Sequence, residues 1–270
     1  QIARAIALGS ISFNLARAAG PALGGVLIAM AGPWAAFAVN ALSFAGVLVV
    51  LLLWKREKTE SSGGQSYHAA LKEGFLYVIR ERTMRNVLVG LFFFMLPATA
   101  LWSLLPLVAR QQLGWDAEGY GLLVTSIGVG AVFAARVLHS LHRRYLLDRT
   151  LAGAMISFAI GLFILGNSEG DTLFHDLIAL VACLVMGAAW MICLTTLNAT
   201  AQMTLSNHIR ARGMGAYMTT MALSMVVGSL IWGQVAHHFG LAATQWTAAA
   251  TLMVTAALSF LFPVDPLQNR

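Results

Sequence analysis

Long, unbroken apolar segments constrain the fold of this chain more than any other feature. A helix needs about 20 predominantly apolar residues to cross a bilayer, and eight segments of the sequence meet that requirement. They are continuous rather than alternating, which indicates helices and not the strands of a membrane barrel. The predicted spans are Ile6–Ala31, Trp34–Trp54, Val87–Ala109, Tyr120–Leu138, Thr150–Asn167, Leu177–Leu197, Met214–Ala236 and Thr244–Phe262. The expected fold class is therefore all-α integral membrane, a polytopic bundle of eight transmembrane helices.

Composition agrees with this prediction and argues against several kinds of site. Hydrophobic residues make up 59% of the 270 residues, charged residues make up 10%, and the mean hydropathy is +0.75. A soluble domain carries about 25% charged residues. Cys183 and Cys193 lie in one predicted helix, where their spacing puts them about 15 Å apart, too far for a disulfide. The paired histidines lack carboxylate or thiol partners at ligand spacing, so we predict no metal site.

The basic residues gather in alternate connections between the predicted spans. Seven Lys and Arg residues lie between the second and third spans, and others follow the fourth span (residues 143–149) and the sixth (Arg210 and Arg212). The intervening connections are nearly free of Lys and Arg, with Arg110 as the exception. This asymmetry is the positive-inside pattern, so we expect both ends of this segment on the cytoplasmic side. The pattern accounts for the net charge of +6, and nucleic-acid binding is not predicted.

The longest connection divides into two parts. Residues 55–66 are rich in Ser and Gly and indicate a flexible linker. Residues 67–85 carry Leu71, Phe75 and Val78 at helical spacing among basic residues. Such a pattern is typical of an amphipathic helix on the cytoplasmic membrane surface. An ordinary cytosolic loop helix is the alternative.

An internal repeat relates the first pair of predicted helices to the last pair. At an offset of 208 residues, Gly20, Gly25 and Gly32 fall on Gly228, Gly233 and Gly240. Equivalent pairs that lie six helices apart indicate a six-helix repeat in parallel orientation, as in transporters built from two halves. We therefore expect four further helices to precede this segment. The expected regions are 1–54, the last two helices of an N-terminal half; 55–85, the linker with its amphipathic helix; and 86–270, the C-terminal six-helix half.

The segment Asn14–Gly25 holds the most specific motif of the sequence. Gly20 and Gly24 lie on one helical face, where missing side chains let a neighbouring backbone approach closely, and Pro21 bends the helix. Helix packing alone would explain a glycine pair. The full string Gly20-Pro21-Ala22-Leu23-Gly24-Gly25, however, resembles the fifth-helix motif of exporters in the major facilitator superfamily.

This resemblance extends along the chain. The segments Ala36–Phe44, Tyr120–Gly130 and Arg210–Gly213 are similar to the branch that contains the enterobactin exporter and other transmembrane secretion effectors, with the chain covering helices five to twelve of twelve. The resemblance implies a secondary transporter of the bacterial inner membrane that exports a small amphipathic molecule, drug-like or siderophore-like, by alternating access. It implies no cofactor. If a proton is the coupling ion, its carboxylate lies outside this segment, since Asp148 sits only at the mouth of a span.

Polar and aromatic residues within the predicted spans are the candidates for a substrate path. Arg17 lies in the middle of the first span, where an intramembrane Arg costs at least ~2.5 kcal/mol and normally faces a cavity or a partner. A structural bond to backbone carbonyls is the alternative for Arg17, and core packing or helix contact is the alternative for the others. The predicted substrate-path residues are Asn14, Arg17, Phe94, Trp102, Trp190, Thr195 and Asn198, and the predicted packing residues are Gly20, Pro21, Gly24, Gly25, Gly228 and Gly233.

Three classes of function fit a polytopic helical protein. A transporter accounts for both the repeat and the motif. An intramembrane enzyme would need an acid, a nucleophile or a metal cluster within the bilayer; the sequence shows none, so we predict no enzymatic activity. A non-transporting scaffold accounts for the helices but not for the repeat. No Walker-type loop occurs, which argues against direct ATP drive within this segment.

The charge asymmetry makes a testable prediction about topology. A cysteine placed at Asp116 or Ser168 should react with an impermeant thiol reagent added to intact cells, because both positions lie in the connections that are poor in basic residues. A cysteine at Ser62 should react only after the membrane is opened. The reverse labelling pattern would overturn the predicted orientation.

Overall fold

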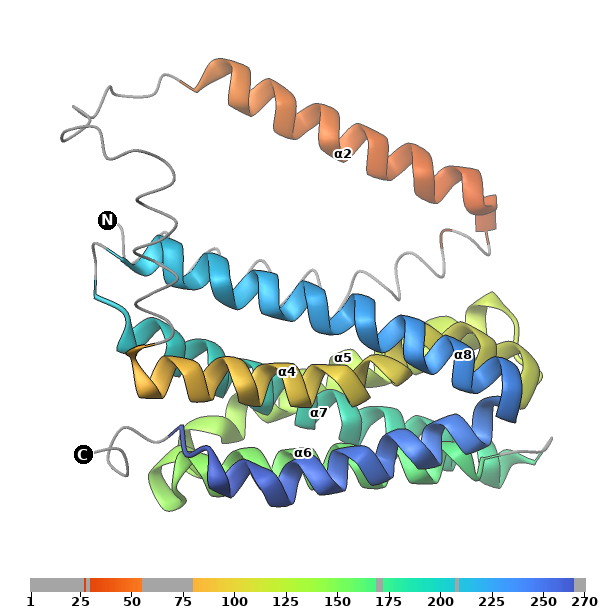
Figure 1. Ribbon diagram of the computed structural model, residues 1–270. Helices are drawn as coiled ribbons and strands as arrows, with labels where there is room; N and C mark the ends of the chain where they lie inside the picture. The colour runs from red at the N-terminus through yellow and green to blue at the C-terminus, as the bar shows by residue number, and fades with distance from the viewer. Residues whose placement is uncertain (1–26, 28–29, 55–79, 169–171, 207–208, 265–270) are drawn as a thin grey trace.

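Figure 1 presents the computed structural model of the chain, which describes residues 27, 30–54, 80–168, 172–206 and 209–264. The described elements are α2 (Pro33–Leu53), α4 (Arg82–Leu107), the π-helix η1 (Val108–Gln112), α5 (Ala117–Arg144), α6 (Leu147–Gly166), α7 (Leu173–Thr204), α8 (Arg210–Leu258) and the 3-10 helix η2 (Ser259–Leu261). All are helical, so the predicted all-α class is confirmed for this part of the chain.

Six helices of the described residues are long and apolar enough to cross a membrane. The last covers 52 residues, Arg210–Leu261. A straight helix of that length would extend about 78 Å, whereas the apolar part of a bilayer is about 30 Å thick. The helix is broken at Gly240, whose φ of 83° and ψ of 171° are not helical, and Figure 1 shows α8 folding back there. We call residues 210–239 the first arm of α8 and residues 241–258 the second arm.

The two arms of α8 correspond to the last two predicted spans, and five other predicted spans fall on α2, α4, α5, α6 and α7. The first predicted span, Ile6–Ala31, lies almost wholly outside the described residues, so the count of eight stays a prediction. The division of the chain at residues 54 and 85 likewise stays a prediction.

The helices extend beyond the predicted spans at their polar ends. α7, for example, runs to Thr204, although its apolar segment was expected to end at Leu197. The expected amphipathic helix lies mostly outside the described residues and stays a prediction. Arg82 and Arg85 belong to α4, which begins after Glu81, whose carboxylate caps the helix by accepting the Thr83 N–H at 3.3 Å.

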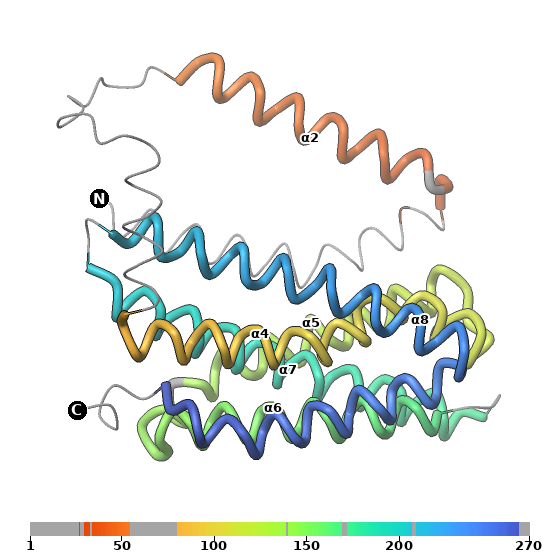
Figure 2. Tube along the Cα trace, viewed as in Figure 1, coloured from red at the N-terminus to blue at the C-terminus, as the bar shows by residue number. Residues whose placement is uncertain are grey.

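α7 lies at the centre of the bundle. Both α5 and α6 pack along it, the first arm of α8 packs against α4, and the second arm packs against α6. Figure 2 shows α8 passing from one side of the bundle to the other through its turn. α2 stands apart from this bundle in Figure 1, and its membrane-spanning window has no buried residues. The apolar surface of α2 is therefore free to face lipid or other helices.

The contact between α5 and α7 depends on two glycines. A Cβ atom added to Gly130 would collide with the carbonyl oxygen of Leu184, and one added to Gly187 would collide with the carbonyl of Ile127. Each glycine thus accepts the backbone of the other helix directly. Without a hydrophobic driving force between helices in lipid, such close van der Waals contact is a main source of association.

The charged residues separate to the two ends of the bundle. Arg82 and Arg85 begin α4, Arg143 and Arg144 end α5, and Arg210 begins α8. The segment that follows η2 returns to this end, where Asn86 Nδ2 of α4 donates a hydrogen bond to the Pro263 carbonyl at 2.7 Å. We call this the basic end, and the opposite end, with Asp116, Glu118 and Asp176, the acidic end. The predicted asymmetry of charge is therefore present in the bundle, while its orientation in the membrane stays a prediction.

The close contact of α5 and α7 can be tested with a matched pair of substitutions. Gly187→Ala should destabilise the protein by about 1–3 kcal/mol or more, because the added methyl group separates the helices. Gly153→Ala on α6 should be neutral or stabilise by up to about 1 kcal/mol, since no atom lies within 4 Å of the added Cβ and Ala favours helix. Thermal unfolding in detergent would measure both, and equal effects would contradict the prediction.

Candidate substrate cavity

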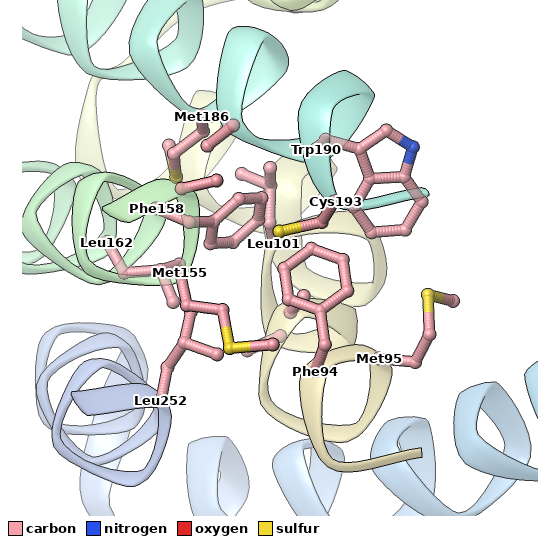
Figure 3. Close-up of a cluster of buried hydrophobic side chains, with 14 of the residues drawn as sticks. Phe94, Met95, Leu101, Met155, Phe158, Leu162, Met186, Trp190, Cys193 and Leu252 are labelled. Carbon is pink, nitrogen blue, oxygen red and sulfur yellow. The ribbon is translucent and has the colours of Figure 1, made fainter. Parts of the chain in front are cut away.

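Two of the predicted substrate-path residues meet across the bundle. Trp102 on α4 and Trp190 on α7 have ring centroids 5.5 Å apart and an angle of 67° between the rings. Phe94 on α4 lies behind them and is 0% exposed; its ring is 5.8 Å from Trp190 and 5.9 Å from Phe158 of α6. Figure 3 shows Phe94, Phe158 and Trp190 gathered between the three helices. Edge-to-face contacts of this kind add about 0.5–1.5 kcal/mol each to the burial of the rings.

The two tryptophans line a cavity of about 470 Å³. Four helices contribute its walls: α4, α5, α7 and the first arm of α8. The residues that line it include Met95, Trp102, Ala131, Trp190, Met221 and Met225. Trp190 is only 6% exposed, so the core rings described above hold it in place at the cavity wall. Phe94 does not line the cavity and instead supports Trp190 from behind.

The wall of this cavity is apolar. None of the residues that line it carries a charge, and the indole Nε1 of Trp102 is buried without a hydrogen-bond partner among the described residues. Met221 and Met225 add flexible, polarisable side chains that adapt to ligands of different shape. These walls suit the aromatic or aliphatic part of a small molecule.

Polar residues of α7 lie closer to the basic end than the cavity does. The Asn198 side chain accepts a hydrogen bond from Gln202 Nε2 at 2.5 Å and interacts with the hydroxyl of the buried Tyr217 on α8. Thr195 donates to the sulfur of Met191 at 3.3 Å. Neither Thr195 nor Asn198 is among the residues that line the cavity. Asn198 joins α7 to the first arm beside the cavity, and Thr195 is satisfied within its own helix.

The first arm of α8 also packs against the part of α4 that contains prolines. Pro97 and Pro106 lie inside α4, and the π-helix η1 follows Pro106 directly. Prolines inside helices disturb the hydrogen bonding of the preceding turn. Near the first of these, the carbonyl of Leu96 accepts a hydrogen bond from Trp232 Nε1 of α8 at 2.7 Å.

The glycines of the first arm differ in their surroundings. A Cβ added to Gly228 would lie 2.7 Å from the Leu96 oxygen and 3.0 Å from the Cβ of Thr99, so this position admits no side chain without movement of α4. Gly233, which was predicted to have a similar packing role, has no described atom within 4 Å of such a Cβ. Asn14, Arg17, Gly20, Pro21, Gly24 and Gly25 lie outside the described residues.

Sequence reasoning missed several residues at this site and elsewhere. Met221 and Met225 recur at helical spacing, which was the available signal, but such a pattern is more often core. Asp148 was expected only at the mouth of a span; it is 4% exposed, and its Oδ1 accepts the Val264 N–H at 2.7 Å. At the same end, a hydrogen bond of 2.9 Å joins Nε2 of His142 on α5 to Oγ1 of Thr196 on α7.

Long apolar helices packed around an apolar cavity define a multi-pass membrane protein. The fold is similar to that of a solved structure of the E. coli fucose:proton symporter, with a TM-score of 0.55 at 17% identity, over 83% of this chain and 56% of that one. The described helices therefore share the fold of that symporter. The sequence pattern of the transmembrane secretion effectors matches residues 1–270, and the chain belongs to that family.

Two curated transporters are similar to the chain in sequence. The staphyloferrin A transporter of Staphylococcus aureus is 21% identical over 260 residues, which are 96% of this chain. The multidrug resistance protein MdtH of Edwardsiella ictaluri is 24% identical over 216 residues, which are 77% of this chain. The chain spans 64% and 50% of the lengths of these two proteins.

Proposed function

We propose that this chain forms the greater part of a secondary active transporter that exports a small amphipathic molecule by alternating access from the bacterial inner membrane. The observation that carries the proposal is the cavity between α4, α5, α7 and the first arm, with Trp102 and Trp190 on its wall. Membership of the transmembrane secretion effector family supports it. The names of the two relatives, a siderophore transporter and a multidrug resistance protein, support a small-molecule substrate.

The chemistry of the cavity favours a ligand with an aromatic or aliphatic body. Stacking or edge contacts with the indole rings would hold a flat ring, and a cationic group near either indole gains about 0.5–2 kcal/mol from the ring face. Because the described residues on this wall carry no charge, an ionic part of the substrate needs partners from elsewhere. Arg17, in the segment that resembles the exporter motif, is our candidate for such a partner.

The other two classes of function receive less support. A scaffold accounts for the helices but not for membership of the transmembrane secretion effector family. An enzyme receives less support because the family and the two relatives are named for secretion, transport and drug resistance. We include coupling to protons in the proposal. The experiments below test it with a protonophore, which removes the proton gradient.

Filling the cavity tests whether it holds the substrate. Cells that express the protein as its gene encodes it would be loaded with ethidium or rhodamine 6G, two flat amphipathic cations, and the initial rate of dye loss followed with and without a protonophore. Ala131→Phe places a ring in the cavity and should lower the rate about tenfold or more. Ala250→Phe, on an exposed site of the second arm, is the matched control and should change the rate less than twofold.

Equal rates for the two phenylalanine variants at equal protein levels would contradict the placement of the substrate. Failure of the unaltered protein to export either dye would contradict export of amphipathic cations. A rate that the protonophore leaves unchanged would contradict coupling to protons.

Substitutions of Arg17 test its proposed role in binding. Arg17→Ala removes a charge that is costly in the bilayer, and Arg17→Lys keeps the charge but loses the planar fork. Both variants should reach the membrane at normal levels and lose export of carboxyfluorescein, an amphipathic anion, because a guanidinium pairs with a carboxylate and not with the cationic dyes. Arg136→Ala, on an exposed site of α5, should do less harm. Degradation of Arg17→Ala would make the residue structural, and normal export would remove it from the substrate path.

A further inference from the structure

We propose that a groove between α5 and α6, on the basic half of the bundle, binds an anionic phospholipid. The acyl chain would lie along α7 and the phosphate beside Arg149. The inference rests on the placement of the chain in a membrane and not on the proposed transport activity.

The groove arises because α5 and α6 diverge from a tight turn. Only Tyr145 and Leu146 connect the two helices, yet each packs along α7 far more than against the other. The space left between them is about 600 Å³, with α7 as its floor through Leu184, Ala188 and Ile192. On the α6 wall, a Cβ added to Gly153 would meet no atom within 4 Å.

The polar side chains inside the groove already have hydrogen-bond partners within the protein. The two hydroxyl groups of the groove are satisfied within α6, because Ser157 donates to the Gly153 carbonyl at 2.8 Å and Thr150 donates to the Leu146 carbonyl at 3.2 Å. The remaining lining residues of the floor and walls are aliphatic or small. A hydrocarbon chain fits such a surface, whereas a polar solute would lose hydrogen bonds to water without replacement.

The mouth of the groove is basic. Arg149 lines it, is exposed, and makes no hydrogen bond or ion pair with the described residues. Arg143 and Arg144 lie just before the turn and are exposed as well, while no lining residue is acidic. Tyr145, 53% exposed, stands at the same level, as aromatic residues do at membrane interfaces. Basic pockets between membrane helices on the cytoplasmic side bind anionic lipid head groups.

The surroundings favour a lipid over a soluble anion. Phe133 and Val137 of α5 and Ile156 and Ile160 of α6 are exposed large apolar residues on the two helices that border the groove. A multi-pass membrane protein presents such residues to the bilayer, so we infer that acyl chains reach the groove laterally. A soluble phosphate compound would gain the contact with Arg149 but leave the apolar floor uncovered.

Lipid binding to the purified protein, as its gene encodes it, tests the inference. Delipidated protein would be titrated with phosphatidylglycerol or with phosphatidylcholine of the same acyl chains, and bound lipid counted by native mass spectrometry. The unaltered protein should bind phosphatidylglycerol more tightly. Arg149→Gln should weaken that binding about fivefold and leave phosphatidylcholine unchanged. Gly153→Phe, which fills the groove, should weaken both, with Gly153→Leu in its place if the larger side chain impairs folding.

Two controls separate this site from general charge effects. Arg110→Gln removes an exposed Arg from the acidic end and should leave both lipids bound as before. Glycerol 1-phosphate at the lipid's concentration should not displace phosphatidylglycerol, and displacement would assign the site to a soluble anion. Equal loss in Arg149→Gln and Arg110→Gln, or unchanged binding in Arg149→Gln and in a folded groove-filling variant, would overturn the proposal.

Discussion

The close approach of α5 to α7 is the contact on which the remaining architecture depends. Gly130 and Gly187 let each helix touch the backbone of the other, and in lipid such packing replaces the hydrophobic driving force available in water. α7 then separates two spaces. Trp190 and Leu194 face the cavity shared with α4 and α8, while Leu184 and Ala188 face the groove shared with α6. Moving α5 away from α7 would open both spaces at once.

The positions of the described helices were readily predicted, because a bilayer requires apolar segments of a minimum length and the backbone must satisfy its own hydrogen bonds there. The ends of the helices were not. The α7 helix continues to Thr204. Its last residues are mostly polar and extend beyond the apolar layer, but they remain helical. The break at Gly240 was marked by its place between two apolar runs, and its residue type suits a positive φ.

The site was predictable only in part, because side-chain direction depends on which helices become neighbours. Trp102 and Phe94 share α4 and looked equivalent, yet the first lines the cavity and the second lies in the core against Phe158. The buried Asp148 accepts a hydrogen bond from the backbone of Val264, which lies 116 residues away in the sequence. No local sequence pattern predicts such a contact. The methionines of the first arm carried no signal that distinguished a cavity wall from ordinary core.

The turn of α8 at a single residue has a mechanical consequence. The first arm carries Met221 and Met225 to the cavity wall, whereas the second arm packs on α6 and brings Val264 back to Asp148 at the basic end. Because one glycine joins the arms, there is no slack loop at the acidic end to absorb a displacement. A tilt of the first arm about the basic end would therefore also displace the second arm where it begins, next to Gly240, and so couple the cavity wall to the helix that packs on α6.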